Sequence, residues 1–158
     1  MSRSVYPLTL FYDGGCAVCS LEMDHLRARC RDGRLVFVDI AAPGFDPAVA
    51  GTTHAALDAE IHGLAADGTL LRGVEVLRLA YEAAGLGIVL RPTAWAPLAP
   101  LADAGYRLFA RHRRRISRVA APLIDAIRAT RARRVAAQMR ACRDGACELE
   151  RTRPGSTS

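Results

Sequence analysis

The chain has 158 residues and contains no lysine, so arginine supplies all 22 of its basic side chains. This bias, together with the high alanine content, is typical of a GC-rich bacterial genome. The chain also lacks any run of about 18 uncharged apolar residues, which excludes a helix that spans a membrane. Residues 1–4 lead directly into an apolar segment, without the apolar core and cleavage site of a signal peptide. We therefore expect a cytoplasmic protein.

Cysteine is scarce as well, because the chain has only five, an odd number. Thiols stay reduced in the cytoplasm, so a Cys-x-x-Cys pair there is catalytic or metal-binding more often than it is a structural disulfide. Two of the five cysteines form such a pair near the N-terminus. The pair is the first place to look for chemistry.

The surroundings of that pair favour redox chemistry. An apolar segment with strand composition, residues 5–12, ends at Asp-Gly-Gly, a strong turn signal. Cys16 and Cys19 follow, and a helix is predicted over residues 17–29. This order places Cys16 at a helix N-terminus, where unpaired N–H groups and the helix dipole favour a thiolate. The spacing places Cys19 one helical turn further on, within reach for disulfide exchange.

Five residues of this stretch receive predicted roles. Cys16 is the predicted attacking nucleophile and the more exposed thiol, whereas Cys19 is the more buried, resolving thiol. Asp13 either bonds the N–H groups of the turn or shuttles the resolving proton. Gly14 and Gly15 permit the backbone of the turn and a close approach of the substrate.

The motif Asp13-Gly14-x-Cys16-x-x-Cys19 after an apolar strand resembles that of the DCC family of predicted thiol-disulfide oxidoreductases, whose fold is thioredoxin-like. The likeness extends over residues 5–147, with further matches at Val38-Asp39-Ile40, Ile61-His62, Asp67-Gly68, Gly73, Trp95, Tyr106, Phe109 and Arg113. It implies that the dithiol exchanges electrons with a disulfide-containing protein or a small thiol substrate. An unidentified electron donor would complete the cycle, and no cofactor is implied.

The predicted elements follow the order of an α/β, thioredoxin-like fold. The composition, 51% hydrophobic and 24% charged, suits one globular domain with a sizeable core. Two strands flanking a helix form a right-handed β-α-β unit, and a hairpin and a second helix follow as β-β-α. The predicted ranges are strands 5–12, 34–40, 60–65 and 69–72, helices 17–29 and 74–84, and a short helix near 46–50. The core is predicted over residues 1–87.

One feature of thioredoxins is missing. Thioredoxins carry a cis-proline opposite the cysteine pair, whereas residues 51–58 of this chain contain no proline. The backbone that docks the substrate is therefore predicted to be formed by other residues, Thr53 and His54.

Positive charge is concentrated in the last third of the chain. Residues 1–105 carry 8 arginines against 12 acidic residues, whereas residues 106–158 carry 14 against 4. A proline-broken segment and a helix over residues 103–139, kinked or split by Pro122, are predicted to form a basic extension over residues 88–147. Residues 148–158 are predicted to be a polar, disordered tail.

The arginines between Arg111 and Arg134 have two interpretations. They form a solvated helix face, or they contact an anionic membrane surface or an acidic partner. Contact with a membrane surface would place the protein at the membrane periphery. Nucleic acid is disfavoured as a partner, because the region lacks a recognition motif and has few aromatic residues.

A second cysteine pair, Cys142 and Cys147, leaves the alternatives open. The pair could close a small disulfide, relay electrons to Cys16 and Cys19, join them in a Cys₄ zinc site, or have no function. A strand–helix junction is not the knuckle turn of a zinc ribbon, so we predict no metal. The alternative function is a non-catalytic binding module on a thioredoxin-like scaffold, held by zinc or associated with a membrane surface.

Overall fold

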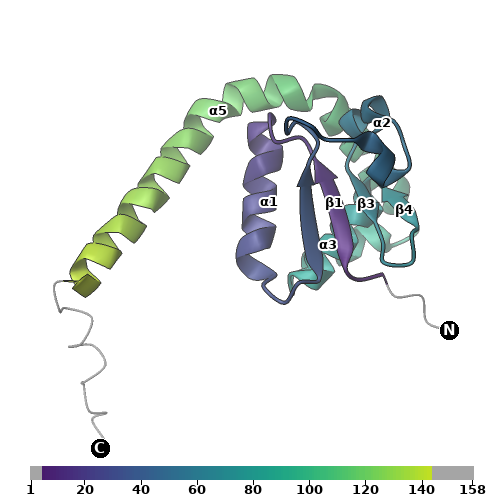
Figure 1. Cartoon of the computed structure of the whole chain (residues 1–158). Coiled ribbons are helices and arrows are strands. Elements are labelled where there is room, and N and C mark those ends of the chain that lie inside the picture. Colours follow the sequence, from purple (N-terminus) through teal and green to yellow (C-terminus); the bar gives the residue numbers. More distant parts are fainter. Residues whose placement is uncertain (1–4, 144–158) are drawn as a thin grey trace, which may run out of the picture. The chain divides into compact units, whose positions relative to one another are not determined.

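The computed structural model describes residues 5–143, and its centre is a mixed four-stranded sheet. The strands are β1 (Leu8–Tyr12), β2 (Leu35–Asp39), β3 (His62–Leu64) and β4 (Leu70–Arg72), in the order β2-β1-β3-β4 (Figure 1). Strands β1 and β2 are parallel, whereas β3 is antiparallel to both β1 and β4. The α/β class is confirmed, and the arrangement is consistent with the predicted thioredoxin-like fold. Strand β1 begins later than predicted, after Pro7, which has no N–H to donate to a neighbouring strand.

The helices are α1 (Ala17–Arg29), α2 (His54–Ala59), α3 (Val74–Ala83), α4 (Gly87–Leu90) and α5 (Ala99–Arg143), with 3₁₀ turns at Pro47–Ala50 and Arg91–Ala94. Helix α1 has its predicted bounds and α3 ends one residue earlier than predicted, whereas α2 and α4 were not predicted. Helix α5 starts earlier than predicted, because Pro100 lies in its first turn, where no intrahelical N–H bond is required. Of the two alternatives predicted for Pro122, the split is wrong, since α5 continues through it, and the kink stays a prediction. One proline removes one N–H bond, and the bonds on either side hold the helix together.

Two clusters of apolar residues cover the two faces of the sheet. On one face, Leu8 and Leu10 of β1 pack with Met23 and Leu26 of α1 and with buried residues of α3. On the other face, Phe11 packs with Leu57 of α2 and with Ile40 and Ala50. Strand β1 is therefore buried on both faces, as expected of a central strand.

The contacts divide the chain into a unit that ends at Ala120 and a second unit that begins at Ala121. The first contains the whole sheet, helices α1 to α4 and the first half of α5. The second contains the rest of α5, in which all residues from Arg131 to Arg140 are exposed. A membrane surface or an acidic partner for these arginines stays a prediction. Within residues 5–143, no helix combines the length and the apolar character that crossing a bilayer requires.

The parallel pairing of β1 and β2 builds the turn that leads to the cysteines. Tyr12 and Asp39 lie opposite each other at the ends of the two strands. The carboxylate of Asp39 therefore reaches the turn and accepts N–H groups from Gly14 and Ala41, both at 2.8 Å. A Cβ atom at Gly14 would overlap this carboxylate, so the turn requires glycine at this position.

We expect Gly14→Ala to lower the free energy of unfolding by about 2–4 kcal/mol, because the Asp39 carboxylate has to leave two charge-assisted hydrogen bonds. Urea denaturation monitored by circular dichroism measures the change. The matched control is Gly105→Ala in α5, where a new Cβ meets no atom within 4 Å. The control should be neutral or slightly stabilising, because alanine is the better helix former. Equal losses in the two variants would contradict this account of the turn.

Candidate active site

Cys16 and Cys19 lie at disulfide distance at the start of α1, with their Cα atoms 5.2 Å apart. Cys16 is the N-cap residue of the helix, and its Sγ accepts the N–H of Cys19 at 3.3 Å. The sulfur of Cys16 thus lies among the unpaired N–H groups of the first turn, where negative charge is stabilised. The predicted position of the pair, after a strand and a glycine turn, is confirmed.

The predicted exposure of the two sulfurs is wrong. Cys16 is only 2% exposed, whereas Cys19 is half-buried and lines a cavity. The cause is α5, which returns to the start of α1 one hundred residues later in the chain. There the Oγ of Ser117, itself buried, accepts the N–H of Ala17 at 2.6 Å.

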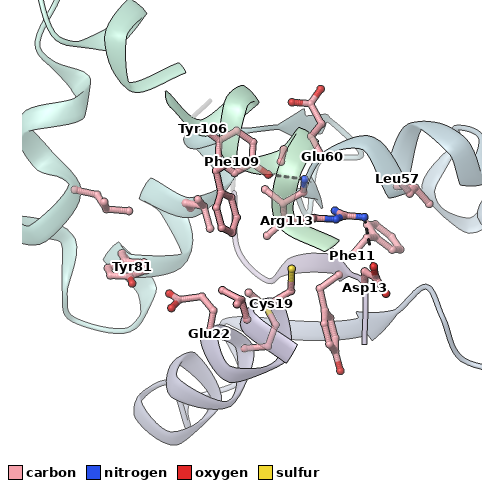
Figure 2. Close-up of a pocket in the computed structure, with 17 residues that line it drawn as sticks. Phe11, Asp13, Cys19, Glu22, Leu57, Glu60, Tyr81, Tyr106, Phe109 and Arg113 are labelled. Atoms are coloured by element: carbon pink, nitrogen blue, oxygen red, sulfur yellow. Dashed lines mark hydrogen bonds and ion pairs between the residues drawn. The ribbon is translucent and has the colours of Figure 1, made fainter. Parts of the chain in front are cut away.

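The cavity has a volume of about 260 Å³ and lies between the end of β1 and helices α1, α2, α3 and α5. Its lining is mostly apolar and aromatic, with contributions from Phe11, Tyr106 and Phe109 (Figure 2). Cys19 lines it, and Cys16 does not. A substrate in this cavity would therefore meet the sulfur of Cys19 first.

Two tyrosine hydroxyls at the cavity have raised pKa values. Burial raises the pKa of Tyr81 to about 12, assisted by a hydrogen bond and the negative charge of Glu22. Burial likewise raises the pKa of Tyr106, whose hydroxyl accepts the N–H of Ile61 at 2.8 Å. Both hydroxyls therefore remain protonated at neutral pH and serve as neutral, polar points in an apolar wall.

An ion cluster centred on Arg113 ties α5 to the cysteine turn. The guanidinium donates to the backbone carbonyl of Asp58 and, at 2.7 Å, to its carboxylate. It also lies 3.5 Å from the carboxylate of Asp13, as the dashed line in Figure 2 marks. Asp13 in turn accepts the N–H of Gly15 at 2.9 Å, which is the contact expected of a turn-forming residue. Both side chains of the Arg113–Asp13 pair are about nine-tenths buried.

The sequence pattern does not predict that Arg113 is buried. It places Arg113 with the other arginines of a solvated or partner-binding helix face. It is 7% exposed, whereas its neighbours Arg114 and Arg115 are exposed. A signal was present, because Arg113 continues a row at helical spacing that starts at Tyr106 and Phe109. Because arginine is charged and usually exposed, the spacing alone did not lead to the prediction that Arg113 lies on the buried side of the helix.

The other predicted site residues lie apart from the cavity. Thr53 is the N-cap of α2 and accepts the N–H of Ala56, and the ring of His54 bonds the carbonyl of Ile40. Neither lines the cavity, and their part in substrate binding stays a prediction. The pair Cys142 and Cys147 lies outside the residues whose side chains are described.

The residues whose side chains are described offer neither a second reactive cysteine nor a metal site. Cys30 is buried and bonds the carboxylate of Asp32 at 3.1 Å; its burial, with this bond, raises the pKa of its thiol. Among the side chains of residues 5–140, no three His, Cys, Asp or Glu are grouped so that they could hold a metal ion.

We expect Arg113→Met to lower the free energy of unfolding by about 3–5 kcal/mol, because it leaves the buried carboxylate of Asp13 without its cation. The matched control is Arg114→Met, which removes a second arginine bonded to Asp58 at 2.7 Å. Arg114 is 69% exposed, so its loss should cost less than about 1 kcal/mol. Urea denaturation of both variants measures the difference, and similar losses would show that the Arg113 cluster does not hold the site.

Comparisons with known proteins identify the family of the chain. An uncharacterized chloroplastic protein of Arabidopsis thaliana is 33% identical over 124 residues, which cover 77% of this chain and 57% of that protein. The chain thus spans little more than half of the length of that relative. No solved structure matches this chain. The profile of the DCC1-like thiol-disulfide oxidoreductases matches residues 10–119, from β1 through Cys16, Cys19 and Arg113. The chain therefore belongs to the DCC1-like thiol-disulfide oxidoreductase family.

Proposed function

We propose that the protein is an enzyme that exchanges electrons between its Cys16–Cys19 pair and thiol or disulfide substrates, and that these reach the pair through the cavity. One observation carries the proposal: Cys19 lines an apolar cavity, whereas Cys16 is buried at the helix N-terminus. The two sulfurs therefore have different tasks. Cys19 bonds the substrate, and Cys16 opens and closes the internal disulfide.

The electron flow follows from access and from leaving-group chemistry. A substrate thiolate attacks the sulfur that it can reach, that of Cys19, and a mixed disulfide forms there while the Cys16–Cys19 bond breaks. Cys16 leaves as a thiolate, stabilised by the N–H of Cys19 and by the helix N-terminus. A second substrate thiolate then attacks the mixed disulfide, which releases the oxidised substrate and leaves two electrons on the protein dithiol. The reverse sequence reduces a substrate disulfide.

The cavity also bears on which substrates fit. A volume of about 260 Å³ accommodates a small thiol, or one cysteine side chain with its neighbour on an extended segment. Its apolar lining favours substrates whose atoms next to the sulfur are apolar. A thiol or dithiol compound serves as the electron donor in this scheme.

The test uses the reduced protein and 4,4′-dithiodipyridine, a small aromatic disulfide whose released thione is measured by absorbance. We expect Cys16→Ser to keep a stable mixed disulfide on Cys19, because the closing thiol is gone; serine is also a good N-cap residue, so the helix start is kept. In Cys19→Ser, the remaining Cys16 should react at least about tenfold more slowly than Cys19 does in Cys16→Ser, because the sulfur of Cys16 is buried. Peptide mapping by mass spectrometry locates the adduct.

Cys30→Ser is the control, since the Cys30 thiol is buried and bonded to Asp32 outside the cavity. It should leave the adduct on Cys19 unchanged. An adduct that forms on Cys16 as fast as on Cys19 would overturn the assignment of Cys19 as the entry point. Complete reduction of the disulfide at the wild-type rate in either cysteine variant, with no adduct left on the remaining cysteine of the pair, would overturn the proposed function itself.

A further inference from the structure

The carboxylate of Glu22 is the least satisfied polar group at the cavity. Its Oε1 atom is buried and has no hydrogen-bond partner, the only such side-chain atom within residues 5–140, whose side chains the structure describes. Glu22 lies on α1 and lines the same cavity as Cys19 (Figure 2). A buried, unpaired carboxylate oxygen costs stability, so its presence in the cavity that Cys19 lines calls for a functional reason.

Glu22 and Cys19 lie three residues apart on α1 and line the same cavity. Residues three apart in an α-helix are neighbours on one face, with Cβ atoms about 5–6 Å apart. Side chains of a helix also tend to lean toward its N-terminus, and Cys19 lies in that direction from Glu22. At this spacing a carboxylate oxygen can take a proton from the thiol, directly or through one water molecule.

A tyrosine on a neighbouring helix interacts with Glu22. The Glu22 carboxylate, through a hydrogen bond and its negative charge, helps to raise the pKa of the Tyr81 hydroxyl in α3. The Oε1 atom of Glu22 has no hydrogen-bond partner. This oxygen is therefore the one left for a proton.

The other titratable groups of the cavity are engaged elsewhere. Asp13 accepts the N–H of Gly15 and faces Arg113, which also bonds Asp58. Glu60 faces Arg72 at 3.8 Å. The hydroxyls of Tyr12 and Tyr106 accept hydrogen bonds from Arg27 and from the backbone of Ile61. This leaves Glu22 as the group placed to exchange a proton with Cys19.

We propose that Glu22 is the proton acceptor and donor for the sulfur of Cys19, an inference that rests on the proposed function. In the reduced protein, Glu22 takes the thiol proton, and the Cys19 thiolate attacks the substrate disulfide. One substrate sulfur bonds Cys19, and the other leaves as a thiolate that takes the proton from Glu22. The Cys16 thiolate then displaces the bound substrate sulfur, so two electrons pass from the dithiol to the substrate.

The first measurement is independent of turnover. In the reduced Cys16→Ser protein, the rate of alkylation of Cys19 by iodoacetamide is followed against pH, with the adduct located by mass spectrometry. Adding Glu22→Gln removes a negative charge next to the thiolate, so the pKa of the Cys19 thiol should fall. We expect alkylation at pH 7 to become roughly three- to tenfold faster. A merely structural role of Glu22 would not produce this shift of the profile.

The second measurement separates a neighbouring charge from a proton carrier. With Cys16 present, Glu22→Gln should slow the reduction of 2-hydroxyethyl disulfide at least about tenfold, because its aliphatic thiolate leaves poorly without a proton. Reduction of 4,4′-dithiodipyridine, whose thiolate leaves readily, should be slowed much less. Glu75→Gln is the matched control, since Glu75 is exposed on α3 and does not line the cavity. Circular dichroism confirms that each variant is folded.

The outcomes distinguish the two proposals. If the alkylation profile of Cys19 is unchanged by Glu22→Gln, or both disulfides are slowed equally, Glu22 is not the proton carrier, while the exchange function stands. If the unsubstituted protein reduces neither disulfide, the proposed function falls, and the role of Glu22 falls with it.

Discussion

The contact between α5 and the start of α1 is the constraint on which the site depends. Ser117 accepts an N–H of the first turn of α1, and Arg113 pairs with Asp13 in the turn before it. These two residues are four apart on one face of α5, so a single helix face covers Cys16 and closes one wall of the cavity. Without this cover, the first cysteine of the pair would be the exposed one, as in a bare strand–turn–helix unit.

Because α5 covers Cys16, the two sulfurs lie in different surroundings: that of Cys16 is stabilised as a thiolate, and that of Cys19 is accessible. Cys16 has the N–H bond and the helix N-terminus, which favour its thiolate. Cys19 lines the cavity. Because a disulfide breaks fastest when the accessible sulfur is attacked and the other leaves as a stable anion, this division suits reversible exchange. The apolar wall strengthens the effect, since charges interact more strongly where water is excluded.

Much of the fold was readable from local patterns. The strand, the Asp-Gly-Gly turn and the helix that begins after Cys16 are set by neighbouring residues, and α1 was predicted with its observed bounds. The requirement for glycine at position 14 was readable only in part. Its turn signal is local, but the carboxylate that forbids a Cβ comes from Asp39, on a parallel strand that pairs with β1.

The sequence by itself determined the chemistry of the pair: two thiols one turn apart, the first at a helix N-terminus, in a chain of α/β order. Only the tertiary structure decided which cysteine lines the cavity and which is buried, since that depends on Arg113 and Ser117, one hundred residues away. Arg113 reads as a surface residue within a run of arginines, because its burial comes from carboxylates on other elements. Glu22 reads as an ordinary helix residue for the same reason: the cavity that leaves its oxygen unpaired is built from several helices that meet only in the folded chain.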